Sequence, residues 1–220
     1  MTTKSKSIGS KIDAQMDAAS KALQEGRYFE AERLSRDALE KAHQAEDYER
    51  MARITLPLQE ARRQKRLLAV DTDRIFRMNE MDEEAALEAG MYLIEPMLVG
   101  AHGRDLRDRA DSMEVPVLVV VREPQTRMGL WPIVMIGPVT VRTQVRPPAG
   151  DKPDAAWMTA TSEALGDAAL EMSTGRDAAD YVDVLMDALG TIGDHERLIQ
   201  ELANACRAAL DEIHAAAASD

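Results

Sequence analysis

Proline is distributed very unevenly along this chain, and its distribution limits where helices can form. Of the nine prolines, only Pro57 falls within the first 95 residues, and the other eight lie between Pro96 and Pro153. Proline has no backbone N–H and its ring clashes with the preceding helical turn, so it is rare inside helices. The sequence therefore predicts two helical ends on either side of a largely non-helical middle region.

The densest group of helix-breaking residues marks a boundary between domains. Residues 146–154 read Arg-Pro-Pro-Ala-Gly-Asp-Lys-Pro-Asp and show no apolar periodicity, which is typical of a linker. The sequence predicts five consecutive regions: a flexible tail at 1–10, a helical region at 11–73, a small α/β domain at 74–146, a linker at 147–154 and an acidic helical bundle at 155–220.

Amphipathic helices are predicted in both end regions. In the N-terminal region, apolar residues recur every three or four positions in three segments, 8–23, 31–42 and 47–68. Pro57 lies inside the third segment, where we expect a kink or a break. Three further apolar stripes in the C-terminal region predict helices over residues 157–168, 178–189 and 198–213.

The turn between the first two predicted helices carries a more specific pattern. In a helical hairpin, a glycine can form the turn, an aromatic side chain two positions on can fill the elbow, and alanines allow the helices to approach closely. The residues that carry this pattern are Gly26, Tyr28, Ala31, Ala38 and Leu39.

Through these residues, the chain resembles a tetratricopeptide (TPR) repeat over about residues 12–66. The match covers the middle of one repeat, which lacks the final proline of the family pattern, and a second repeat from about residue 46 lacks most of the signature. TPR arrays normally need three or more repeats to bury a continuous core, so these helices must pack against the rest of the chain or another subunit. The resemblance implies a protein-interaction module, and an ordinary helical hairpin is the alternative.

The middle region has the pattern of a small sheet. Val117–Val121 is a continuous β-branched run, typical of a strand buried on both faces, and residues 103–113 before it have helical spacing. A strand, a helix and a strand within about 30 residues predict a βαβ unit. Residues 74–79 are compatible with a strand or with the end of a helix. Strands are predicted at 91–95, 117–121, 131–136 and 139–145.

The net charge of −12 is concentrated in the C-terminal region. Residues 1–150 carry 23 basic and 24 acidic side chains, whereas residues 151–220 carry 4 and 15. An acidic chain is not attracted to phosphate backbones or anionic membranes, which disfavours nucleic acid and membranes as partners. The single cysteine excludes an internal disulfide, and no apolar run approaches the ~20 residues that span a bilayer. We expect a soluble, cytoplasmic protein.

One basic cluster stands out in this acidic chain. Between residues 50 and 77 there are 8 basic and 3 acidic side chains. The cluster is compatible with a nucleic-acid surface, with a solvated helix face, or with a face that meets the acidic C-terminal helices within one chain or between subunits. Its candidate partner-binding residues are Arg62, Arg63, Lys65 and Arg66.

Two loops are candidates for an anion or nucleotide site. Residues 100–105 follow a predicted strand and open a helix, where backbone N–H groups favour an anion, and residues 122–129 follow the buried strand at its carboxyl end. Structural turns and a solvated loop are the alternatives, because the glycine spacing of nucleotide-binding motifs is absent. The candidate ligand-binding residues are His102, Arg104, Arg122 and Arg127.

The remaining reactive residues form no recognised motif. No two of the four histidines are three or four positions apart, so neither a metal site nor a cofactor is predicted, and no catalytic residue is assigned. Cys206 lies beside alanines on a predicted helix, which favours a buried thiol over a nucleophile. With only two Phe and two Trp available, the 13 methionines are expected to fill gaps in the core.

Together these patterns predict a predominantly helical α+β fold. It comprises N-terminal TPR-like hairpins, a small mixed sheet with one βαβ crossover and a C-terminal acidic three-helix region. We expect a non-enzymatic interaction or adaptor protein that uses its TPR-like surface and opposed charge patches to bind a protein partner or a second copy of itself. The alternative is a small-molecule or nucleotide-binding α/β domain, with or without enzyme activity, whose anion site lies at the 100–105 and 122–129 loops.

Overall fold

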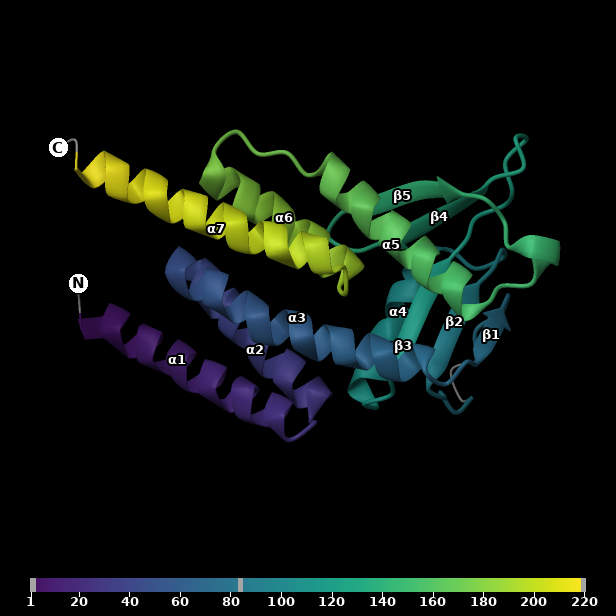
Figure 1. Cartoon of the computed structure of the whole chain (residues 1–220), viewed down its shortest axis with the longest axis horizontal. Coiled ribbons are helices and arrows are strands. Elements are labelled where there is room, and N and C mark those ends of the chain that lie inside the picture. Colours follow the sequence, from purple (N-terminus) through teal and green to yellow (C-terminus); the bar gives the residue numbers. More distant parts are fainter. Residues whose placement is uncertain (1–2, 83–84, 219–220) are drawn as a thin grey trace. The chain divides into compact units, whose positions relative to one another are not determined.

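The computed structural model describes residues 3–82 and 85–218, and these residues form a predominantly helical α+β fold, as predicted (Figure 1). The helices of the described residues are α1 (Thr3–Gln24), α2 (Tyr28–Gln44), α3 (Tyr48–Val70), α4 (Gly100–Ser112), α5 (Ala155–Met172), α6 (Ala178–Ile192) and α7 (Glu196–Ala217). The strands are β1 (Ile75–Met78), β2 (Gly90–Ile94), β3 (Val117–Val121), β4 (Trp131–Ile136) and β5 (Thr140–Val145), and a short 3-10 helix covers Ala149–Asp151.

The chain divides into two compact units, each assembled from separate stretches of sequence. The helical unit comprises Met1–Gln64, Thr174–Met186 and Ile199–Asp220, and the sheet unit comprises Lys65–Ser173 and Asp187–Leu198. The five consecutive regions expected from the sequence stay a prediction. Of the expected tail at 1–10, residues 1–2 lie outside the described residues and residues 3–10 are helical in α1.

In the helical unit, α1 and α2 form an antiparallel hairpin (Figure 1). Small side chains line the contact between the two helices. Ala22 on α1 and Ala31 on α2 are fully buried and pack with Ala61 of α3. Small side chains at these positions let the helix backbones approach closely. Pro57 lies within α3, whose helical assignment continues from Tyr48 to Val70, so the helix does not break there.

The two turns of the helical unit repeat one geometry at an interval of 20 residues. At the first turn, Gly26 has φ +73° and the Arg27 N–H donates to the Ala22 carbonyl at 2.8 Å. At the second, Glu46 has φ +51° and the Asp47 N–H donates to the carbonyl of Ala42 at 2.9 Å. Both turns satisfy the last carbonyls of a helix in the pattern of a Schellman motif. The second turn therefore has the same geometry without the glycine.

In the sheet unit, β1, β2 and β3 form a parallel sheet in that order, and β4 and β5 form an antiparallel pair. Gly90 pairs with Val117 and Ile75 with Met91, and an isolated bridge between Arg122 and Ile133 joins the end of β3 to β4. The predicted βαβ unit is β2–α4–β3. The segment whose assignment the sequence left open, 74–79, contains strand β1.

The parallel sheet is covered well enough to bury its central strands. All five residues of β2 and the last four of β3 are buried. Helix α4 contacts β3 and β4, and α5 contacts β5 and β3. A Cβ on Gly103 would overlap the side chain of Val121, so this glycine allows the first turns of α4 to lie directly against β3.

Candidate functional site

The basic cluster at 62–66 is largely engaged in ion pairs. In the helical unit, the Arg62 Nε donates to Glu32 Oε1 at 2.8 Å, and the two side chains are only 10% and 8% exposed. Arg63, whose side chain is 52% exposed, has its Nη1 3.8 Å from Glu60 Oε2. These contacts place Arg62 in the interior of the helical unit, whereas Arg63 is accessible.

The other two members of the cluster pair with acidic side chains of the sheet unit. The Nζ of Lys65 lies 2.5 Å from Asp111 Oδ1, and Arg66 contacts Glu163 and Glu196. Both Glu163 and Glu196 belong to the acidic C-terminal region of the sequence. The ion pairs of Arg66 therefore agree with one of the three interpretations of the cluster, namely that basic side chains meet acidic C-terminal helices within one chain. The partner-binding role of the four residues stays a prediction.

The two candidate anion-binding loops emerge at the same edge of the sheet. Because β2 and β3 are parallel, the segments that follow them both start at the carboxyl edge, which is where α/β proteins bind ligands. The segment after β2 leads into α4 at Gly100, so residues 100–105 are its first turns. There the Nδ1 of His102 accepts a hydrogen bond from the Val99 N–H at 3.0 Å, which caps the helix.

Three charged side chains form a connected network at this edge. Glu95 directly follows β2, and its Oε1 accepts hydrogen bonds from Arg77 Nη2 and Arg122 Nη2, both at 2.7 Å. Its Oε2 accepts from Arg77 Nε at 2.8 Å, and the Arg122 guanidinium lies 4.4 Å from the centre of the Trp131 ring. The hydrogen bonds from Arg77, and those from Arg122, hold the pKa of Glu95 below its usual value against the opposing effect of its burial. Glu95 thus occupies the place that an external anion would take beside Arg122.

Arg122 was predicted from the sequence as part of this edge, whereas Glu95 and Arg77 were not. The available sequence signal was a glutamate immediately after a buried strand. Because the carboxyl ends of parallel strands lie at the same edge of a sheet, such a residue is expected at that edge. The other predicted residues are more peripheral. The side chain of Arg104 is 46% exposed, and its Nη2 lies 3.8 Å from Oδ1 of its neighbour Asp105. Arg127 is exposed in the loop between β3 and β4.

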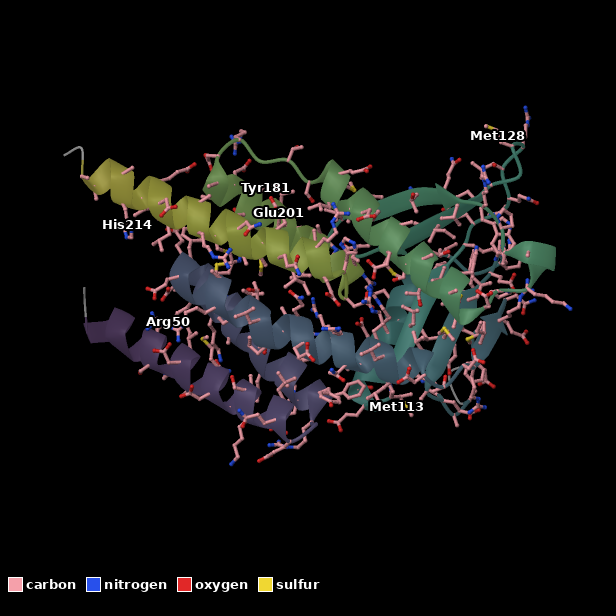
Figure 2. The ribbon with its side chains drawn as sticks, viewed as in Figure 1. Arg50, Met113, Met128, Tyr181, Glu201 and His214 are labelled. Carbon is pink, nitrogen blue, oxygen red and sulfur yellow. The ribbon has the colours of Figure 1, made fainter. Side chains whose placement is uncertain are left out.

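Exposed apolar side chains lie in the two segments that follow β2 and β3. Met97 is 88% exposed and Val99 50% exposed in the segment between β2 and α4, and Met128 is 84% exposed. Figure 2 shows Met128 at the tip of the loop between β3 and β4. That loop is closed by a hydrogen bond from the Thr126 N–H to the Leu130 carbonyl at 2.9 Å. We call Met97, Val99 and Met128 the loop surface.

The expectation that methionines fill the core holds for only some of them. Met51, Met91, Met135 and Met158 are buried, whereas the two methionines of the loop surface are among the most exposed large apolar side chains of the described residues. The exposure of Met97 and Met128 could therefore not be predicted from the sequence, because residue type alone does not distinguish an exposed methionine from a buried one.

A second polar cluster, which the sequence analysis missed, surrounds His195 between α6 and α7. The side chain of His195 is 1% exposed, and its Nδ1 accepts a hydrogen bond from the Leu198 N–H at 3.3 Å. Its Nε2 lies 3.4 Å from Glu163 Oε2 and 3.3 Å from Asp167 Oδ1 on α5. A Cβ on Gly166 would overlap the imidazole, so this glycine makes room for the ring. The cluster anchors the junction of α6 and α7 within the sheet unit.

Two further reactive residues, His43 and Cys206, lie in the helical unit. His43 pairs with Asp183 at 2.7 Å in the helical unit. Cys206 is fully buried as predicted, and burial raises the pKa of its thiol to about 12, which keeps it protonated and unreactive at neutral pH. Among residues 3–82 and 85–218, no three His, Cys, Asp or Glu side chains form a metal-binding group, and no helix has the length and apolarity needed to cross a membrane.

Comparisons with known proteins give no match. No protein-family model matches the chain, and neither the curated proteins nor the solved structures include a significantly similar one. The TPR-like character of residues 12–66 therefore stays a prediction, and function is inferred from the geometry alone.

Proposed function

We propose that this protein is a non-enzymatic interaction or adaptor protein that binds a protein partner through the loop surface. The observation that carries the proposal is a contrast at the carboxyl edge of the sheet. The charged groups there, Glu95, Arg77 and Arg122, are engaged with one another, while Met97 and Met128 are more than four-fifths exposed.

This contrast favours a protein partner over a small anionic ligand. A ligand site normally presents a few unengaged polar groups in a concave, mostly apolar pocket. Protein interfaces instead have apolar centres in which methionine is enriched, surrounded by a polar rim. Methionine also adapts its flexible side chain to the shape of a partner.

The helical unit supports the same class of function. Gly26 adopts the left-handed conformation that a TPR-like turn requires, and Ala31 and Ala38 are fully buried. A TPR-like hairpin would offer a second contact surface, as the resemblance implies. Because Arg62, Lys65 and Arg66 are largely occupied by ion pairs, we place the primary contact at the loop surface.

The test is to make the loop surface polar and compare the proteins that the purified chain retains from an extract of its source cells. We expect a variant that combines Met97→Ser, Val99→Ser and Met128→Ser to retain its specific partners at least ten-fold less than the unchanged protein, because the apolar contact area is lost. The matched control combines Met113→Ser and Met172→Ser, whose side chains are 49% and 52% exposed in the same unit. Equal retention by the loop-surface variant and the unchanged protein would contradict the proposal.

A small-molecule or nucleotide ligand at the same edge is the second candidate function. It is favoured by one observation, namely that the segments carrying His102, Arg104, Arg122 and Arg127 both begin at the carboxyl edge. A thermal-shift screen with phosphorylated metabolites and nucleotides separates the two functions. A ligand at a hundred times its Kd stabilises a protein by about 2.7 kcal/mol, and the Arg122→Met variant should lose that shift.

A further inference from the structure

The buried imidazole of His195 has its two ring nitrogens in unlike surroundings. Its Nδ1 accepts a hydrogen bond from the Leu198 N–H at 3.3 Å, and Leu198 is fully buried. Helix α7 begins at Glu196, so this N–H belongs to the first turn, whose N–H groups have no partner within the helix. His195 therefore caps α7 with a ring nitrogen at a place where little water is available to replace it.

The other ring nitrogen, Nε2, faces two carboxylates of α5. It lies 3.3 Å from Asp167 Oδ1 and 3.4 Å from Glu163 Oε2, and neither contact is a well-aligned hydrogen bond. A ring nitrogen accepts a hydrogen bond only where it carries no hydrogen, so the contact with Leu198 assigns the single hydrogen of the neutral ring to Nε2. The neutral ring thus presents an acceptor to the helix and a donor to the carboxylates.

The charged groups around the ring sum to −1 when the ring is neutral. Glu163 and Asp167 face Nε2 from α5. Glu163 also pairs with Arg66 of α3, which lies 3.4 Å from Glu196 of α7. Asp167 also pairs with Arg197 of α7. Three carboxylates and two guanidiniums thus surround the ring, and a positive charge on the ring would balance them.

A second proton on this ring can bind only at Nδ1, where it meets the N–H of Leu198. Two donors then face each other, and the Leu198 N–H loses its acceptor. The ring has little space to turn away, because it lies directly against the backbone of α5, where a Cβ on Gly166 would come within 2.3 Å of its Cδ2 and Cγ atoms. The effect of the second proton therefore falls on the first turn of α7.

We propose that His195 is a pH-sensitive helix cap: the neutral ring holds the first turn of α7, and uptake of a second proton releases it. Histidine is the side chain that ordinarily changes charge between about pH 5 and 8, so the release is expected within that range. The charged ring exchanges its bond to the Leu198 N–H for ion pairs with Glu163 and Asp167. No residue of the loop surface takes part, so failure of the proposed function would leave this cap unaffected.

The first experiment follows the ring nitrogens of His195 and the amide of Leu198 by NMR in the full-length chain. At about pH 7.5 we expect a hydrogen on Nε2 and none on Nδ1, and at about pH 5 a hydrogen on both. Hydrogen exchange at Leu198, corrected for the intrinsic effect of pH, should become about ten-fold faster at the lower pH because the amide loses its acceptor. A hydrogen on Nδ1 at the higher pH, or a ring that stays neutral at the lower pH, would overturn the proposal.

The matched control is the amide of Trp157, which occupies the same position in the first turn of α5. It donates to the carboxylate of Asp154 at 2.7 Å, and after the same correction it should exchange equally at both pH values. Equal exchange of Leu198 at both pH values would show that the cap does not depend on the proton. Equal acceleration at both amides would show that acid loosens the sheet unit as a whole, which also contradicts the proposal.

Two variants separate the proton from the cap. His195→Asn keeps an oxygen acceptor for the Leu198 N–H, since asparagine is a preferred cap residue, and it takes up no proton in this range, so its Leu198 exchange should be the same at both pH values. Asp167→Asn removes one of the charges that face Nε2, so release should require a lower pH than in the unchanged chain. Acid-dependent exchange in His195→Asn, or release at an unchanged pH in Asp167→Asn, would contradict the assignment. The measurements on the unchanged chain do not depend on the folding of either variant.

Discussion

At the scale of single residues, the contact between Gly166 and His195 is among the closest in the sheet unit. A Cβ on Gly166 would overlap the imidazole ring, which is itself almost fully buried. We predict that Gly166→Ala lowers the free energy of unfolding by about 1–3 kcal/mol, the usual cost of overpacking a core. Urea denaturation followed by circular dichroism measures this change.

The steric cause can be separated from a change in helix propensity by a double-mutant cycle. In a His195→Ala background the ring is absent, so Gly166→Ala should cost at least about 1 kcal/mol less than it does in the unchanged chain. An equal loss of unfolding free energy in both backgrounds would show that Gly166 is not required to make room for the imidazole ring of His195.

The Glu95 carboxylate links stability to pH. Its hydrogen bonds to Arg77 and Arg122 lower its pKa in the folded protein, so it favours folding above its unfolded pKa of about 4.3, and this contribution is lost as the pH falls through the lower folded pKa. We predict that Glu95→Gln lowers the free energy of unfolding by about 1–2 kcal/mol at pH 7. The difference between the variant and the unchanged chain should shrink steadily below pH 4.

Unfolding curves measured between pH 3 and pH 7 provide the test. Glu88→Gln is a suitable control, because Glu88 pairs with Arg74 through side chains that are each about half exposed, at 51% and 53%. A pH-independent difference for Glu95→Gln would mean that the carboxylate charge does not contribute through these arginines.

At the scale of secondary-structure elements, the two turns of the helical unit make opposite predictions. Gly26 and Glu46 occupy equivalent left-handed positions, and only glycine adopts this conformation without a steric cost. We predict that Gly26→Ala destabilises the protein by about 1–2 kcal/mol and that Glu46→Gly stabilises it by up to about 1 kcal/mol. Thermal unfolding by calorimetry detects both changes.

A glycine placed elsewhere on the same helix controls for backbone flexibility. Glu40 is exposed within α2, where glycine in place of glutamate should cost about 1 kcal/mol. Stabilisation by Glu46→Gly beside destabilisation by Glu40→Gly would confirm that the turn geometry decides the sign. Destabilisation by both would contradict it.

Local patterns were sufficient to predict most elements. Apolar periodicity places the helices because each must bury one face. The continuous apolar run of β3 instead predicts a strand buried on both faces, and its last four residues are buried. The segment 74–79 was ambiguous because four residues of strand carry too little periodicity. At Pro57 a kink or a break was expected, and the helical assignment of α3 continues through this residue, since a helix of 23 residues has enough other hydrogen bonds to tolerate one lost donor.

Contacts between distant segments could not be predicted from local patterns. Arg66 and Glu163 are 97 positions apart, and nothing in either neighbourhood indicates that they pair. The same is true of Glu95 and Arg77, which meet only because β1 and β2 are parallel neighbours. Consequently the residues that pair with the basic cluster within the chain could not be identified from the sequence, and the network at the sheet edge and the cluster around His195 were missed.

At the scale of the whole molecule, the composition of the two units predicts how fragments behave. The helical unit draws on residues 174–186 and 199–220 as well as on 1–64. We predict that a fragment of residues 1–73 does not unfold cooperatively, because it lacks residues 174–186 and 199–220 of the same compact unit. Circular dichroism during thermal unfolding measures cooperativity, and mixing with a fragment of residues 74–220 should restore it. A cooperative transition for residues 1–73 alone would instead support the consecutive boundaries expected from the sequence.

Three helices, α3, α6 and α7, contribute residues to both units. This interleaving has a consequence for inheritance. No continuous stretch of coding sequence specifies either unit, so an exchange of one continuous segment between genes would not carry a single unit by itself, and a breakpoint at a unit boundary within α3, α6 or α7 would split a helix. We therefore expect the two units to be inherited together.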